Sequence, residues 1–294
     1  MRVGLQIPVF KWPGGTAEIA PRLAQIARTA EQAGFYSLWV MDHFFQIPSM
    51  GPKEDPMLEA YSTLSYLAAH TEKVRLGALV TAVVYRHPGV LVKTATTLDV
   101  LSGGRSYLGI GAAWFEQEAQ ALGIPFPPQK AERFVRLEEA LQIIHRMWSG
   151  DRTPYHGRFY QLEEPLNSPP PLSQPHPPLM IGGMGEKKTI PLVARYADAC
   201  NFTGAHDLDN LRHKLDVLKA ACEAAGRDYN EIERTVLGSV DLRPGGMTAQ
   251  EMVAWIRELA ALGFQHVIVN MPNVHEITPL EIIGREVIPA LAGL

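Results

Sequence analysis

Two residues that could do acid–base chemistry stand together at the end of an apolar, strand-like run. Asp42 and His43 are the last two residues of the run 37–43. A histidine there can give or take a proton, because its unperturbed pKa is about 6.5. If both residues continued the strand, their side chains would point to opposite faces, so their adjacency does not imply a hydrogen-bonded pair. The alternative is that the loop backbone satisfies His43 and that His43 does no chemistry.

A second segment of chemical interest is rich in glycine. The sequence IGGMGEKKT (181–189) follows an apolar run and precedes a helix-like one. Glycines at such a turn let backbone N–H groups approach an anion, and the helix dipole adds partial positive charge, to which the two lysines would contribute. The alternative is a tight turn without a ligand, in which Glu186 occupies the positive helix end. The segment is neither a Walker A loop nor GxGxxG, because Lys188 stands where the third glycine should be.

Patterns for several other kinds of chemistry are absent from the sequence. The ten histidines form no HxH or HExxH pair, and Cys200 and Cys222 form no CxxC, so we expect no metal site and no disulfide framework. No GxSxG or Ser-His-Asp pattern marks a nucleophile. An enzyme that relies on an organic cofactor therefore fits better than a hydrolase that uses side chains alone.

Charge and hydropathy exclude further classes of protein. The formal net charge is −4 with both signs scattered, which does not suit a nucleic-acid binder. We find no run of about 18 apolar residues and no signal peptide at the start of the sequence. We therefore expect a cytoplasmic protein that binds neither nucleic acid nor membrane.

The elements that must position these residues alternate regularly. Eight strand-like runs are expected at 3–9, 37–43, 74–84, 106–113, 179–183, 199–204, 235–241 and 266–272. Helix-like runs are expected after them at 16–34, 55–71, 88–104, 114–148, 186–196, 207–226, 248–263 and 279–294. Most of the strand-like runs are continuously apolar, as in a parallel sheet that is buried on both faces.

Eight such units predict an α/β fold of the (β/α)8 TIM-barrel type, as a single domain over 1–294. Insertions are expected mainly between strands 4 and 5, where the polar and proline-rich segment 149–178 interrupts the alternation. The alternative is a doubly wound open sheet, but the first strand–helix turn, PVFKWPGGT, lacks the dinucleotide fingerprint which that fold would need. In a barrel, functional residues gather where the strands lead into the following loops.

Segments along essentially the whole chain resemble the bacterial-luciferase-like superfamily. They are SLWVMDHF, VRLGALVT, HPGVLVKTATTLDVLSGGR, LGIGAAWFEQE, ERFVRLEEALQIIHRMW and IGGMGEKKTIPLVARYADACN. Within that superfamily, the chain is most similar to the branch of oxidoreductases that depend on coenzyme F420, a 5-deazaflavin. The resemblance implies a TIM barrel, in agreement with the eight units.

The resemblance also implies where the cofactor lies. Its ring would cover the end of strand 3, where family members carry a non-proline cis peptide, and the matching bond is Leu79–Val80. His43 would lie close to the reacting face. The implied cofactor-binding residues are Asp42, Leu79, Val80, Thr81, Ala112, Ala113, Gln117, Gly182, Gly183, Met184 and Gly185. The three glycines would hold the cofactor's phosphate, which FMN carries as well.

One position departs from the branch that acts on sugar phosphates. That branch has a proton-donating carboxylate where the helix after strand 4 begins, and this chain has Trp114 there, with Glu116 two residues later. We therefore expect no sugar-phosphate substrate. An aromatic-walled pocket for a larger, apolar substrate is suggested instead, although some of its residues can be core; the candidates are Gln6, Phe10, Trp12, Phe44 and Trp114.

The main functional hypothesis is an oxidoreductase that moves a hydride between C5 of F420 and a small organic substrate, with His43 as acid, base or polar stabiliser. One alternative is a monooxygenase that uses FMN and oxygen, with reduced cofactor supplied by a separate reductase. Another is a non-catalytic protein that binds flavin or deazaflavin. The resemblance further suggests a homodimer.

Overall fold

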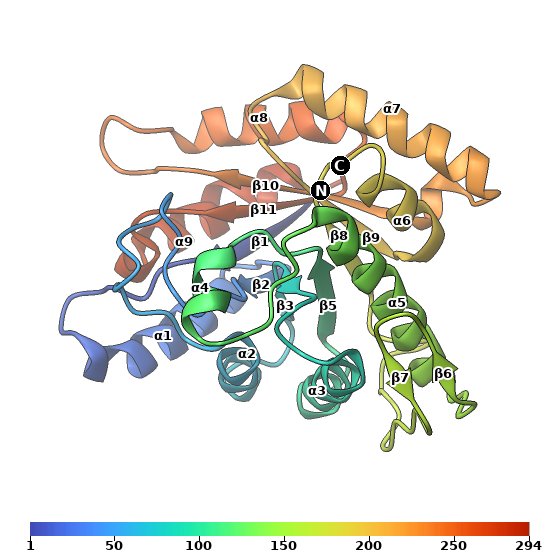
Figure 1. Cartoon of the computed structure of the whole chain (residues 1–294). Helices are drawn as coiled ribbons and strands as arrows, with labels where there is room; N and C mark the ends of the chain where they lie inside the picture. Colours follow the sequence, from blue (N-terminus) through green and yellow to red (C-terminus); the bar gives the residue numbers. More distant parts are fainter. Residues whose placement is uncertain (294) are drawn as a thin grey trace.

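The barrel strands form one parallel sheet that closes on itself. The computed structural model describes residues 1–293. The strands are β1 (Arg2–Ile7), β2 (Ser37–Val40), β3 (Arg75–Ala78), β4 (Thr81–Ala82), β5 (Ser106–Gly111), β8 (Leu179–Gly182), β9 (Ala199–Thr203), β10 (Glu233–Ser239) and β11 (His266–Asn270). Their order is β3-β2-β1-β11-β10-β9-β8-β5-β4, and the pairing of β3 with β5 closes the ring (Figure 1). The predicted (β/α)8 TIM barrel is confirmed.

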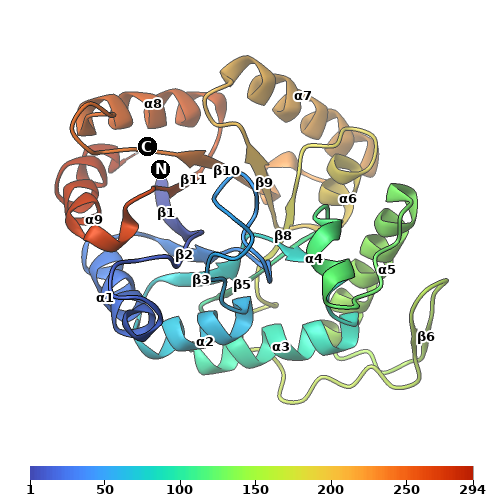
Figure 2. The same ribbon diagram turned by 60° about the vertical axis from the view of Figure 1, so that its left-hand side comes forward.

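Helices surround the barrel, as the view in Figure 2 shows. The main ones are α1 (Ile19–Gln32), α2 (Ala60–Ala69), α3 (Pro88–Leu101), α5 (Lys130–Ser149), α6 (Thr189–Tyr196), α7 (Leu208–Ala225) and α8 (Ala249–Leu262). Local signals set their ends: α8 begins with a capping box between Thr248 and Glu251 and ends at Gly263, whose φ is 104°. Within residues 1–293, no helix combines the length and the apolar character that a membrane crossing requires.

The predicted insertion lies between β5 and β8. The chain between these strands forms α4 (Glu116–Ala121) and α5, and the predicted insertion 149–178 then contains a small antiparallel hairpin of β6 (Tyr155–His156) and β7 (Gln161–Leu162). Two carboxylates hold it to the barrel helices. Glu139 of α5 accepts backbone N–H bonds from residues 158–160, and Asp99 of α3 accepts those of Leu172 and Ser173. Because these bonds satisfy backbone donors, the irregular segment packs without leaving them unpaired.

Three expected elements are interrupted in the structure. The strand expected over 74–84 is interrupted after Ala78, where a bulge separates β3 from β4. The helix expected over 114–148 is two helices, because Gly123, with a φ of 71°, and the prolines after it end α4. The C-terminal helix becomes α9 (Thr278–Ile282) and a π-helical turn (Ile283–Val287), and Pro289 begins a separate 3-10 turn.

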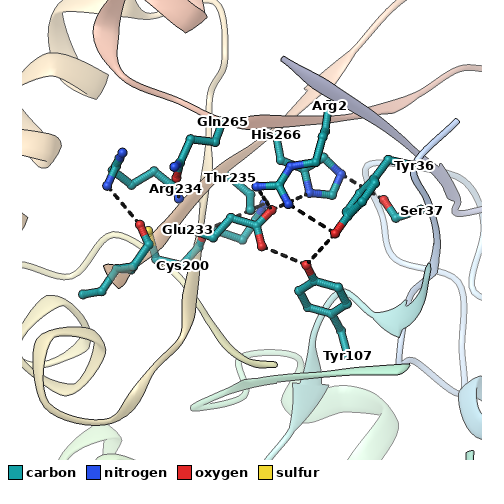
Figure 3. A network of polar contacts seen from close by, with 12 residues as sticks. Arg2, Tyr36, Ser37, Tyr107, Cys200, Glu233, Arg234, Thr235, Gln265 and His266 are labelled. Atoms are coloured by element: carbon teal, nitrogen blue, oxygen red, sulfur yellow. Dashed lines mark hydrogen bonds and ion pairs between the residues drawn. The ribbon is translucent and has the colours of Figure 1, made fainter. Parts of the chain in front are cut away.

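The amino-terminal end of the barrel is closed by a polar network (Figure 3). Glu233 forms an ion pair with Arg2 (3.1 Å) and accepts hydrogen bonds from His266 Nδ1 (3.0 Å) and from the Tyr107 hydroxyl (2.9 Å). His266 Nε2 lies 2.9 Å from Ser37 Oγ. The buried polar groups at this end are therefore paired with one another. Their role is to stabilise the barrel.

Candidate functional site

A cavity of about 970 Å³ opens at the carboxyl ends of the barrel strands. This is the end at which TIM barrels carry their active sites. The cavity brings together His43, Trp114 and most of the predicted cofactor-binding residues, although they are far apart in the sequence. Those residues are Asp42, Leu79, Val80, Thr81, Ala112, Ala113, Gly182, Gly183, Met184 and Gly185.

His43 is held from behind by a buried carboxylate. Its Nδ1 lies 2.5 Å from Oε1 of Glu118, a side chain with no exposed surface. The other oxygen of Glu118 accepts backbone N–H bonds from Phe44 at 2.6 Å and Phe45 at 3.0 Å. Tyr85 donates its hydroxyl to Oε1. Glu118 therefore ties α4 to the loop after β2 and fixes the orientation of the imidazole.

The donors around Glu118 favour its ionised form. Burial alone would raise the pKa of Glu118, but hydrogen bonds from His43, Tyr85 and the Phe45 N–H outweigh it and lower that pKa. Burial, the hydrogen bond to Glu118 and its charge raise the pKa of Tyr85, so Tyr85 remains a hydroxyl donor. A carboxylate that faces neutral donors and an imidazole is suited to orient the ring.

Asp42 has a different set of partners. Arg86 donates to both of its oxygens, at 2.7 and 3.0 Å, and also to Glu59 at 2.5 Å. Burial would lower the pKa of Arg86, but the hydrogen bond and charge of Asp42 raise it. Although strand alternation would separate them, Asp42 and His43 line the same cavity. This is possible because β2 ends at Val40, before either residue.

The bulge between β3 and β4 lies at the floor of the cavity. The Leu79–Val80 peptide is cis, which confirms the prediction. The side chain of Val80 occupies space that two glycines leave free. A Cβ on Gly182 would lie 2.9 Å from both Val80 methyl groups, and one on Gly111 3.0 Å from Cγ2. Gly182 is therefore needed for packing against the bulge.

The next glycines shape the turn into α6. Gly183 has a φ of +118°, a backbone conformation that residues with a side chain rarely adopt. A Cβ on Gly185 would lie 2.9 Å from the Thr189 hydroxyl oxygen. Among the described residues, the N-cap residue Lys188 makes no side-chain hydrogen bond to the start of α6. The turn therefore leaves backbone N–H groups of the helix start available beside the cavity.

Glu186 does not occupy the start of α6. Its carboxylate instead bonds the side chains of Lys214 and, at 2.9 Å, His213, both on α7. These two hydrogen bonds lower the pKa of Glu186. The alternative in which Glu186 satisfies the helix end is therefore not what the structure shows.

The rim of the cavity carries an excess of positive charge. The basic side chains that line it are Lys130, Arg133, Lys187, Lys188 and Lys214. Within residues 1–293, Arg133 Nε is buried and has no hydrogen-bond acceptor. Because that atom is sealed from solvent and another nitrogen of Arg133 donates to the carbonyl of Pro127 at 2.7 Å, Arg133 does not itself mark an anion site. The lysines make the rim suited to an anionic group.

Five predicted site residues lie outside the cavity lining. Gln117 is exposed, because the inward face of α4 carries Glu118 and Ala119 instead. Gln6 is buried and accepts from Asn270 at 2.9 Å inside the barrel. Three aromatic candidates also stand elsewhere: Phe10 and Trp12 pack in the hydrophobic core, and Phe44 stacks beside Tyr85. Trp114 is the aromatic candidate that lines the cavity, and 61% of it is exposed.

Sequence reasoning missed Glu118, Tyr85 and Arg86. For Glu118 the sequence offers one signal: Phe115, Glu118 and Ala119 have the spacing of one helix face, and the structure buries all three. A carboxylate on the buried face of a helix needs partners, and that points to a role. Tyr85 and Arg86 carry no comparable signal, since their partners lie at positions 118 and 42, far away in the sequence.

The arrangement combines three capabilities at one cavity. The bulge at Val80 offers a surface against which a flat ring can lie, the turn into α6 and the lysines suit a phosphate, and His43 can transfer a proton. Within residues 1–293, no group of three or more His, Cys, Asp or Glu side chains is arranged to hold a metal ion.

Comparisons with known proteins agree with this geometry. A family model described as luciferase-like monooxygenase matches residues 1–278. The F420-dependent glucose-6-phosphate dehydrogenase of Kineococcus radiotolerans is 33% identical over 226 residues. That alignment covers 74% of this chain and 64% of that protein, so the chain spans less than two thirds of that relative's length.

Two solved structures share the fold. An F420-dependent secondary alcohol dehydrogenase, in complex with an F420–acetone adduct, is similar with a TM-score of 0.81 and 21% identity, over 98% of each chain. Monooxygenase RslO1 from Streptomyces bottropensis is similar with a TM-score of 0.81 and 17% identity, over 98% of this chain and 99% of that one. At these identities the likeness supports the fold alone.

Proposed function

Because this chain belongs to the luciferase-like monooxygenase family, we propose that it is an oxidoreductase that transfers a hydride between coenzyme F420 and a small organic substrate. The observation that carries the proposal is that one cavity joins an acid–base histidine, a surface for a ring and an anion-binding turn. Its volume of about 970 Å³ is large enough for a cofactor and a substrate together.

The residues present fit the cofactor. Lys187 and Lys188 line the cavity beside the start of α6, where the N-cap residue makes no side-chain hydrogen bond, so positive charge meets the helix end there. The phosphate of the cofactor would lie at that turn. Its ring would lie against Val80. When bound there, the deazaflavin supplies a carbon that accepts or donates a hydride.

The protein's own part in the reaction is proton handling and orientation. His43 lines the cavity, and Glu118 holds one of its ring nitrogens, so the other nitrogen is free to exchange a proton with substrate. Trp114 packs edge-on against the imidazole, with ring centroids 5.5 Å apart, and would form an apolar wall for the substrate. Glu116 is exposed and outside the lining, so the prediction of a substrate other than a sugar phosphate is retained.

A titration with F420 and with FMN, followed by fluorescence quenching, tests the choice of cofactor. We expect affinity in the micromolar range for F420 and much weaker binding of FMN. Micromolar affinity for FMN alone would overturn the F420 proposal and favour the FMN-dependent monooxygenase. Saturable binding of F420 without turnover of any substrate in a broad panel would instead favour a non-catalytic binding protein.

A charge reversal tests the position of the phosphate. Lys188→Glu should weaken F420 binding by about tenfold, because it places a negative charge beside the anion. Lys219→Glu makes the same change on α7, outside the cavity lining, and should leave affinity unchanged. Equal affinities of the two variants would show that the phosphate does not bind at the turn. The homodimer and, for the FMN-dependent alternative, the separate reductase are proposals that rest on the resemblance, and the cytoplasmic location is a proposal that rests on the sequence pattern.

A further inference from the structure

The hydrogen bonds that Glu118 accepts determine which nitrogen of His43 carries the proton. Oε2 accepts from the backbone N–H groups of Phe44 and Phe45, at 2.6 and 3.0 Å, and these groups can only donate. Oε1 accepts from the Tyr85 hydroxyl. The same oxygen lies 2.5 Å from His43 Nδ1. A bare Nδ1 lone pair at that distance would face the negative charge of the carboxylate, so Nδ1 must carry a hydrogen.

The other nitrogen of the ring therefore has the opposite character. A neutral imidazole holds one N–H, so with hydrogen on Nδ1 the lone pair is on Nε2. Within residues 1–293, no group forms a hydrogen bond with Nε2 of His43. The ring is packed between the cavity and Glu118, with Trp114 and Phe115 against its edges at 5.5 and 5.7 Å between centroids. Nε2 is thus the nitrogen left for a ligand in the cavity.

We propose that Glu118 is a positioning residue that locks neutral His43 as the Nδ1–H tautomer, so that Nε2 meets the substrate as a proton acceptor. The consequence for catalysis rests on the proposed function. For a substrate with a hydroxyl on the reacting carbon, the O–H proton passes to Nε2, the C–H hydrogen leaves as a hydride, and the C–O bond becomes a carbonyl. The balance requires a hydride acceptor, which is the deazaflavin of the proposed function.

Substituting Glu118 by glutamine makes a sharp test, because the amide can fit the site in one orientation only. With its NH2 group toward Phe44 and Phe45, donor would face donor. With its oxygen toward them, the NH2 group faces Tyr85, which can accept, and His43 Nδ1. Nδ1 must then accept, and the hydrogen of the neutral ring moves to Nε2. Glu118→Gln should therefore reverse the tautomer of His43 without changing its position.

The measurement is 15N NMR of the histidine side chains in protein without cofactor, at a pH where imidazoles are neutral. The His43 signals are identified by their loss in His43→Asn. We expect Nδ1–H in the wild type and in Tyr85→Phe, which keeps the carboxylate, and Nε2–H in Glu118→Gln. An Nε2–H tautomer in the wild type, or an unchanged tautomer in a folded Glu118→Gln protein, would overturn the proposal.

Turnover provides a second readout. It would not change if Glu118 had a purely structural role. Glu118→Gln should lower kcat by about 10²-fold or more, as expected when a base presents the wrong tautomer. Its affinity for F420 should stay within about threefold of the wild type, since Glu118 lies outside the cavity lining. Glu118→Asp keeps the carboxylate and should recover part of the turnover. If Glu118→Gln does not fold, the wild-type tautomer alone decides the question, independently of whether F420 is the cofactor.

Discussion

At the scale of single residues, the two acid–base candidates after β2 are held by different partners. Asp42 is paired with Arg86, whereas His43 is paired with Glu118. Arg86 neutralises Asp42 by a bidentate pair, which suits a fixed polar contact to a cofactor better than proton transfer. His43 keeps one nitrogen free. We therefore assign proton transfer to His43 and cofactor contact to Asp42 within the proposed function.

Replacing His43 separates these two roles. His43→Ala should lower kcat by about 10² to 10⁴-fold, because an acid–base group is lost. Its Kd for F420 should change by less than about threefold, since the implied contacts to the cofactor come from other residues. Steady-state kinetics and fluorescence titration measure the two quantities on the same preparation. Unchanged turnover would exclude His43 from the reaction.

His43 could be predicted from the sequence, but Glu118, the residue that orients it, could not. A histidine at the end of a predicted strand can be recognised from strand pattern alone. Glu118 contacts residues 43–45, about seventy positions earlier, and no local pattern encodes that meeting. The neighbouring Gln117 was predicted instead of Glu118. The two residues are adjacent on α4 and therefore face in different directions. The packing of α4 determines that Glu118 is the one that faces inward.

At the scale of elements, the bulge between β3 and β4 depends on its neighbours in the sheet. Gly111 is on β5 and Gly182 is on β8, and both leave room for the side chain of Val80, whereas a Cβ on Gly109 would first meet the carbonyl oxygen of Ala78 at 2.2 Å. The glycines at this end of the sheet are therefore part of the cavity floor. Gly183 and Gly185 serve the separate purpose of turning the chain into α6.

A double-mutant cycle tests this packing. Gly182→Ala puts a Cβ 2.9 Å from both Val80 methyl groups and should lower the free energy of unfolding by about 1–3 kcal/mol. Val80→Ala removes those methyl groups, so adding it to Gly182→Ala should restore part of the loss. Urea unfolding of the four proteins gives the coupling energy. Strictly additive effects would show that Val80 and Gly182 do not compete for space.

The eight strand–helix units could be predicted because buried parallel strands are continuous apolar runs. What could not be predicted is where aromatic side chains in the loops point. Phe10 and Trp12 follow β1 and were expected in a substrate pocket, but they are 2% and 5% exposed and belong to the core. Loop position brings a residue to the correct end of the barrel, and packing then decides whether it faces the cavity.

At the scale of the whole molecule, the two ends of the barrel do different work. The carboxyl end is open and holds the cavity, whereas the amino end is filled by the network of Arg2, Glu233 and His266 (Figure 3). Gly4 is needed there, because its Cβ would lie 2.3 Å from Ser37 Oγ and 2.7 Å from His266 Nε2. The closed end supplies rigidity to the strands that position the site.

This network should make the protein less stable in acid. Burial lowers the pKa of His266 despite the nearby Glu233, so the unfolded chain takes up a proton below about pH 6.5 that folded His266 resists. The pKa of Glu233 is also lowered: burial would raise it, but the hydrogen bonds from His266 and Tyr107 and the charge of Arg2 outweigh burial. Its contribution to stability is complete above the unfolded pKa and is lost as pH falls through the folded one. Both effects lower the free energy of unfolding as the pH falls.

Chemical denaturation at a series of pH values checks that sign. As the pH falls below about 6.5, the free energy of unfolding should fall, because the unfolded histidine takes up a proton that folded His266 resists. His266→Gln should flatten the curve in this range. The same substitution at the exposed His156 is the control and should leave the slope as it is. A slope that persists in His266→Gln would mean that another group is responsible.

The central claim is that the cavity supports hydride transfer with F420 and does not require oxygen. The most direct measurement is turnover of reduced F420 with a panel of carbonyl compounds, and of oxidised F420 with the matching alcohols, under argon and in air. We predict consumption of cofactor at equal rates with and without oxygen, and loss of at least about 10²-fold of that rate in His43→Ala. Turnover that requires oxygen, or that proceeds only with reduced FMN, would contradict the account.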